Sequence, residues 1–137
     1  MPSGYRQLDH TADLALELWG DSEEEILVIG AVAVTDILTG GADIADRIAF
    51  DIAIDAVDPG DRLVQWLNEI IVAAISGGFL FHSAAIALDG ATRLTALARG
   101  EQGGSGRVVA ELKSATYHDL ALERAELGWR ARVIIDV

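Results

Sequence analysis

The fold is decided by the stretch DPGDRLVQWLNEIIVAAISGG, residues 58–78. Its apolar residues recur every three or four positions, which predicts one continuous stripe along a helix. Asp58 supplies a capping side chain, Pro59 suits the first helical position, and Gly77 and Gly78 end the helix. We therefore expect a helix whose stripe packs against the remainder of the domain, and the stripe consists of Leu63, Trp66, Leu67, Ile70, Ile71, Ala74 and Ile75.

Segments of alternating polarity lie on both sides of this helix. Apolar residues that recur at every second position predict half-buried strands. Asp89-Gly90 and Leu127-Gly128 are typical of hairpin turns between such strands. The predicted strands cover residues 14–18, 48–54, 79–88, 92–98, 120–126 and 129–135.

A second helix is predicted nearer the start of the chain. Ser22 followed by Glu25 has the spacing of a capping box, with acidic residues in the first turn facing the positive helix end. Ile26, Ile29, Ala33 and Ile37 continue at helical spacing. Thr39-Gly40-Gly41 then provides the stop.

The order of these elements is typical of an α+β fold, in which two helices pack on a mostly antiparallel sheet. A length of 137 residues suits one domain, and we expect that domain to span residues 1–137. The glycine-rich stretch 100–106 is interpreted as a mobile surface loop within this domain.

Composition excludes several classes of function. With 22 acidic against 10 basic residues, the formal net charge is −12, which argues against direct nucleic-acid binding and against docking on anionic membranes. The chain has no Cys and therefore no disulfide or zinc–thiolate site. Its longest apolar run, residues 70–75, is far shorter than the roughly 20 residues that span a bilayer. The first residues lack the apolar core of a signal peptide, so we expect a cytoplasmic protein.

Motifs of two common enzyme classes are missing. No Gly-Lys-Ser/Thr follows the glycines at 100–106, so a phosphate-binding loop is not expected. Neither Ser76 nor Ser83 lies in the Gly-x-Ser-x-Gly elbow of serine hydrolases.

The first polar cluster is the segment 9–13, just before the first predicted strand. Asp9, His10 and Asp13 place two carboxylates and an imidazole within this segment, a set that could bind a divalent cation or perform acid–base chemistry. Alternatively, Asp9 and Thr11 cap a turn and His10 is a solvated loop residue.

Two further polar groups lie near the end of the chain. Segment 111–119 holds the only lysine, Lys113, together with Tyr117 and His118. Alternation would put Lys113 and Glu111 on one face, where a simple ion pair at a sheet edge is the alternative to a functional site. The last residues, 136–137, combine the Asp136 side chain with the terminal carboxylate at the end of an apolar strand, although chain ends are usually just solvated.

In four stretches the sequence resembles the archease family, the small accessory proteins of the GTP-dependent RNA ligase of tRNA splicing. The stretches are His10–Asp13, Leu63–Glu69, Glu111–His118 and Trp129–Val137. They follow in order along nearly the whole chain, which makes chance similarity an unsatisfactory explanation.

The resemblance implies a strand-helix-strand-strand module with an inserted helix-and-strand unit. It also implies a divalent metal site formed by Asp13, Asp136 and the final carboxylate of Val137. Hard oxygen ligands of this kind suit Ca²⁺, Mg²⁺ or Mn²⁺. His10, Lys113 and His118 are the candidate contacts to a partner or nucleotide, and no catalytic residues are expected.

Family resemblance further implies that the protein promotes guanylylation and turnover of an RNA ligase in tRNA splicing or RNA repair. One departure concerns stretch 100–107, which lacks a histidine expected there in the family; this puts contacts of that stretch to a partner in doubt. Two alternatives remain: a metal-dependent phosphohydrolase with His10 or His118 as the base, and a non-catalytic protein-binding module.

Overall fold

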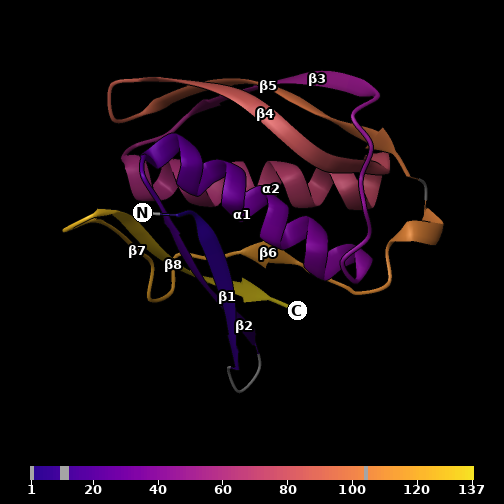
Figure 1. Cartoon of the computed structure of the whole chain (residues 1–137), viewed down its shortest axis with the longest axis horizontal. Coiled ribbons are helices and arrows are strands. Elements are labelled where there is room, and N and C mark those ends of the chain that lie inside the picture. The colour runs from indigo at the N-terminus through magenta and orange to yellow at the C-terminus, as the bar shows by residue number, and fades with distance from the viewer. Residues whose placement is uncertain (1, 10–12, 104) are drawn as a thin grey trace.

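The computed structural model describes residues 2–9, 13–103 and 105–137, and it places two helices between two antiparallel sheets (Figure 1). The helices are α1 (Glu23–Thr39) and α2 (Pro59–Gly77), with a short 3₁₀ turn at Ser105–Arg107. The strands are β1 (Gly4–Asp9), β2 (Asp13–Gly20), β3 (Ile48–Asp55), β4 (Phe79–Asp89), β5 (Arg93–Gln102), β6 (Ser114–Ala115), β7 (Ala121–Ala125) and β8 (Gly128–Asp136).

The predicted α+β class is confirmed, and the strands are divided between two sheets rather than gathered in one. The larger sheet has the order β1-β2-β8-β6, and β7 pairs with β8 along the edge that β6 also uses. The smaller sheet has the order β3-β5-β4. α1 packs on β2 and β4, while α2 packs on β4 and β6, so each helix contacts both sheets.

Both helices begin and end where the sequence predicts. The Ser22 hydroxyl accepts a hydrogen bond from the Glu25 amide at 3.1 Å, and the Asp58 carboxylate accepts one from the Asp61 amide at 2.8 Å. Gly40 and Gly78 follow the two helices with φ of 69° and 71°, the left-handed conformation that glycine adopts without strain.

The apolar stripe of α2 lies in the core, with one exception. Trp66 and Leu67 are fully buried, and the indole nitrogen of Trp66 donates a hydrogen bond to the Leu27 carbonyl of α1 at 2.7 Å. Ile70 and Ile71 are buried as well. Ile75, predicted as part of the stripe, is instead 50% exposed, although the neighbouring Ala74 is buried.

The stretch 100–106 was predicted to be a loop throughout, and this prediction is wrong for its first residues. Gly100 to Gln102 belong to β5, and the loop begins after them. At Gly100 the backbone of β4 comes so close that an added Cβ would lie 1.9 Å from the Leu80 carbonyl oxygen. The glycine that suggested a loop is therefore required for close strand packing.

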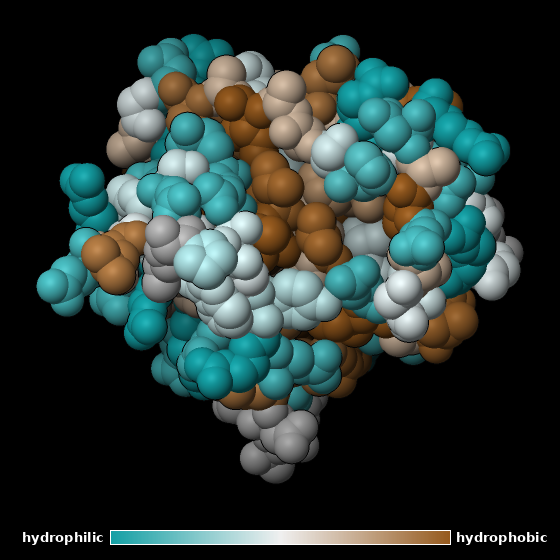
Figure 2. Space-filling model, in the orientation of Figure 1, coloured by the Kyte–Doolittle hydropathy of each residue, from teal (hydrophilic) through white to brown (hydrophobic). Residues whose placement is uncertain are grey.

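The helices leave an apolar area on the surface between the two sheets. Figure 2 shows apolar side chains gathered in the middle of this face, between hydrophilic margins. Several apolar residues of α1 are only partly buried, Val28 and Val32 among them. Among the described residues, neither helix is long and apolar enough to cross a membrane.

Candidate metal centre

Asp13 and Asp136 meet at one end of the five-stranded sheet. Asp13 is the first residue of β2, Asp136 is the last of β8, and the antiparallel register pairs them directly. Directly opposed residues point to the same face, with Cβ atoms about 4.5–5.5 Å apart. Two acidic residues from opposite ends of the chain thereby occupy paired positions on one face of the sheet.

The apolar alternation of β2 and β8 enforces this pairing. Leu16 and Val133 are opposed, and both are completely buried toward the helices. A register slip of one residue would turn these side chains to the outer face, at a large cost in burial. The core thus fixes which residues meet at the sheet end.

Strand β6 brings the segment of Lys113 to the other side of Asp136. Ser114 is opposed to Asp136, and the Lys113 amide donates a hydrogen bond to the Asp136 carbonyl at 2.8 Å. The Lys113 side chain is exposed. Because Asp136 has a strand on each side, its backbone is held although its side chain lies at the surface.

A residue without an assigned role in the sequence analysis holds β6 in place. The Asn68 side chain of α2 accepts a hydrogen bond from the Ala115 amide at 2.7 Å and donates one to the Ala115 carbonyl at 3.2 Å. The signal that could have found it is an asparagine, a poor helix former, in a helix segment otherwise rich in buried apolar residues.

His118 lies away from this sheet end. β6 runs antiparallel to β8, so the chain leaves Asp136 as it proceeds to Thr116, whose amide donates to the Ile134 carbonyl. The His118 ring is 68% exposed and lies 3.4 Å from the Asp119 carboxylate. His10, the other predicted histidine, lies outside the described residues.

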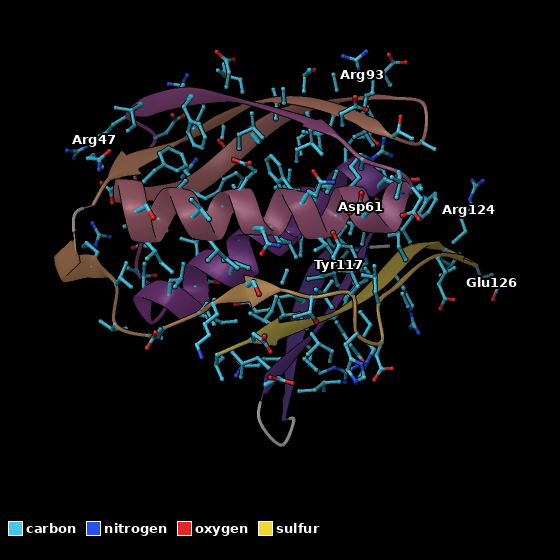
Figure 3. All side chains as sticks on the ribbon, turned by 180° about the vertical axis from the view of Figure 1, so that it is seen from behind. Arg47, Asp61, Arg93, Tyr117, Arg124 and Glu126 are labelled. Carbon is cyan, nitrogen blue, oxygen red and sulfur yellow. The ribbon has the colours of Figure 1, made fainter. Side chains whose placement is uncertain are left out.

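Tyr117 ties the segment after β6 to the first turn of α2 (Figure 3). Its hydroxyl donates a 2.6 Å hydrogen bond to the Asp61 carboxylate. This bond raises the pKa of Tyr117 and lowers the pKa of Asp61, because it favours the neutral phenol and the ionised carboxyl. His118 is exposed, but its position in the chain is fixed by the hydrogen bond of the preceding Tyr117.

The donor chemistry at the sheet end fits a hard divalent cation. Carboxylate oxygens are the preferred ligands of Ca²⁺, Mg²⁺ and Mn²⁺. Within the described part of the chain, no three His, Cys, Asp or Glu side chains cluster as a ready metal site. Asp13 and Asp136 are the two side chains at this sheet end that could hold such a cation, and Val137, the third predicted ligand residue, directly follows Asp136.

This architecture defines a class of small α+β proteins in which two helices separate a five-stranded from a three-stranded antiparallel sheet. The chain belongs to the archease family: the model described as "Archease protein family (MTH1598/TM1083)" matches residues 5–137.

Relatives in other organisms match over nearly their whole length. The archeases of Methanosarcina barkeri and Methanopyrus kandleri are each 28% identical to this chain and cover 97% of it, with 95% and 99% of their own lengths matched. The solution structure of Methanobacterium thermoautotrophicum protein 1598 is similar with a TM-score of 0.75 and 26% identity, over 98% of this chain and 99% of that one. A crystal structure from Thermotoga maritima, described as an archease and possible chaperone, gives a TM-score of 0.59 at 26% identity, over 96% of each chain.

Proposed function

We propose that this protein is a non-catalytic, cytoplasmic accessory protein that activates a GTP-dependent RNA ligase, promoting its guanylylation and repeated turnover in tRNA splicing or RNA repair. Membership in the archease family supports an accessory role. The single observation that carries the proposal is the direct pairing of Asp13 with Asp136 beside the Lys113 segment.

In this proposal Asp13, Asp136 and the Val137 carboxylate hold one divalent cation, either Ca²⁺, Mg²⁺ or Mn²⁺. Once bound, the ion would supply a concentrated positive charge for contact with phosphate groups. The residues contribute a rigid platform, because β2 and β6 hold the Asp136 backbone from both sides. Lys113, whose amide is bonded to the Asp136 carbonyl, offers an exposed ammonium as a point charge suited to phosphate.

The surface charge supports docking on a basic partner. A net charge of −12 complements an RNA ligase whose substrate groove must attract phosphates. His10 and His118 remain candidate contacts to that partner. Direct binding of RNA by this chain is not part of the proposal.

The decisive experiment measures ligation by the cognate RNA ligase with GTP, a divalent ion and substoichiometric amounts of this protein. The wild type should raise the number of turnovers per ligase, and Asp13→Ala should remove most of the stimulation. Asp51→Ala is the matched control, because Asp51 is an exposed strand aspartate of the three-stranded sheet. Full stimulation by folded Asp13→Ala, or none by the wild type, would refute the proposal.

The same samples separate the two alternatives. Hydrolysis of phosphoesters by the isolated protein, lost in Asp13→Ala, would identify a metal-dependent phosphohydrolase. Binding to the ligase without any stimulation would identify a protein-binding module.

Metal binding is tested directly by titrating Mn²⁺ and following the free ion by electron paramagnetic resonance. Asp13→Ala and Asp136→Ala should each weaken binding by about tenfold or more, because hard-cation affinity depends on the number of anionic ligands. Asp51→Ala should bind like the wild type. Equal affinities for all of these proteins would show that the cation is bound elsewhere.

A further inference from the structure

The outer face of the five-stranded sheet, turned away from the helices, carries a hollow of about 240 Å³. Side chains of β1, β2, β7 and β8 surround it. A second, more open hollow adjoins it and shares Arg6, Trp19 and Arg130 with the first. Together the two hollows form one groove. The polar side chains around the first hollow are Arg6, Glu17, Trp19, Glu123, Arg130 and Arg132.

Strand register explains why these side chains gather. Glu17 is opposed to Arg132, and Trp19 is opposed to Arg130, so the four residues project from neighbouring positions of β2 and β8. β1 adds Arg6 opposite Glu17, and β7 adds Glu123 opposite Arg130.

The groove brings together three cations of a chain that has only 10 basic residues and a net charge of −12. Arg6 already forms an ion pair, since its guanidinium lies 2.6 Å from the Glu17 carboxylate. Within the described residues, the Arg130 and Arg132 side chains have no such ion pair, and Arg130 is exposed. Two guanidinium groups are thus available to an anionic group, which the remaining acidic surface would repel.

Trp19 provides a fixed aromatic wall. Gly4 of β1 lies against its indole so closely that an added Cβ would come within 2.6 Å of a ring carbon. The ring therefore has the β1 backbone behind it and borders both hollows. A held indole beside guanidinium groups can stack a flat heterocycle.

We propose that this groove is a binding site for a mononucleotide. The base stacks on the Trp19 indole, the phosphate accepts hydrogen bonds from Arg130 and Arg132, and the Glu123 carboxylate accepts from N–H groups of the base. Guanine suits such a carboxylate because it carries two adjacent N–H donors. The site lies on the same face as Asp13 and Asp136 but about 13 Å along β8 from the latter, four residues at roughly 3.3 Å each.

The proposal goes beyond the ligase role and does not depend on it, because binding is measured on this protein alone. Isothermal titration calorimetry with guanosine monophosphate is done in the presence of a chelator, which removes any contribution from a cation at Asp13 and Asp136. We expect saturable one-to-one binding with a Kd of about 1 mM or tighter. Inorganic phosphate and guanosine should each bind at least about tenfold more weakly, because each lacks one half of the contacts.

Variants assign the contacts. Arg130→Ala/Arg132→Ala should weaken guanosine monophosphate binding by at least about tenfold. The matched control is Arg47→Ala/Arg93→Ala, which removes the same charge from arginines beside the three-stranded sheet (Figure 3) and should leave binding unchanged. Glu123→Gln should weaken guanosine monophosphate but not phosphate, since the carboxylate faces the base. Circular dichroism confirms that each variant is folded.

Several results would overturn the proposal. Phosphate that binds as tightly as the nucleotide would show a simple anion site. Equal losses in the groove and control variants would show that general charge governs binding. Nucleotide binding that requires Mg²⁺ would place nucleotide recognition elsewhere. The same would follow if no saturable binding with a Kd of about 1 mM or tighter were found.

Discussion

The Asn68 side chain closes the open edge of β6 by forming two hydrogen bonds with the backbone of Ala115, at 2.7 and 3.2 Å. Successive residues of a strand direct their amide and carbonyl groups to alternate sides. Thr116 donates to the Ile134 carbonyl of β8, while the amide and carbonyl of the preceding Ala115 face α2. One amide of a helix thus replaces a neighbouring strand, and it holds the segment that lies against Asp136.

Replacing Asn68 by Ala should lower the free energy of unfolding by about 1–3 kcal/mol, because the Ala115 amide and carbonyl lose their partners. Urea denaturation gives this value, and hydrogen exchange of the Ala115 amide should become faster. Gln65→Ala is the control from the same helix, where the side chain donates to the Asp61 carboxylate near the surface. It should change stability by no more than about 0.5 kcal/mol. Equal effects of the two substitutions would contradict the anchoring role.

Truncation in the α2 stripe should separate buried from exposed positions. Leu67 is fully buried and Ile75 is 50% exposed. We expect Leu67→Ala to cost about 2–5 kcal/mol, through lost burial and the cavity that remains. Ile75→Ala should cost far less, within about 0.5 kcal/mol. Chemical denaturation measures both, and a small loss for Leu67→Ala would mean that the helix presents a different face to the sheets.

The two glycines Gly100 and Gly77 should respond oppositely to a methyl group. In Gly100→Ala the new Cβ would meet the Leu80 carbonyl oxygen, so the β4–β5 backbones must separate, at about 1–3 kcal/mol. At Gly77 nothing lies within 4 Å of the added Cβ, and alanine should stabilise by about 0.4–1 kcal/mol. Thermal unfolding of both variants compares them. Tolerance of alanine at Gly100 would show that the strands are not in such close contact.

Tyr5 should ionise only in strong alkali. Its hydroxyl donates a 2.7 Å hydrogen bond to the Asp36 carboxylate, and burial together with this bond raises the pKa of Tyr5 to about 12. The unfolded pKa is about 10. Because the folded pKa is the higher one, the stabilisation is complete below about pH 10 and is lost as the pH rises toward about 12.

In the Tyr117→Phe protein, the near-ultraviolet absorbance measured at rising pH reports the ionisation of Tyr5 alone, because the chain has two tyrosines. The Tyr5→Phe protein, tested by denaturation at rising pH, should lack the part of the pH dependence that this residue causes. A folded Tyr117→Phe protein that titrates near pH 10 would show that Tyr5 is not held by Asp36.

The sequence was most informative where a local interaction defines the structure. The caps at Ser22 and Asp58 and the left-handed glycines Gly40 and Gly78 act within one turn, so the helix limits could be predicted. Periodicity likewise identified the long strands, because alternation reports which face is buried. β1 and β6 were not predicted, since β6 has only two residues and the β1 sequence GYRQLD shows little apolar alternation, so both edge strands depend on their neighbours for pairing.

By itself, the sequence determined the α+β class, the two helices and the residues of the α2 core, because local propensity and apolar period are properties of neighbouring residues. Its likeness to archeases also singled out Asp13 and Asp136. Only the tertiary structure decided that the strands divide between two sheets, that Asp13 and Asp136 are opposed, and that Arg130, Arg132 and Trp19 share one groove. These relations depend on long-range strand register, which is set when buried side chains from distant segments pack on the same helices.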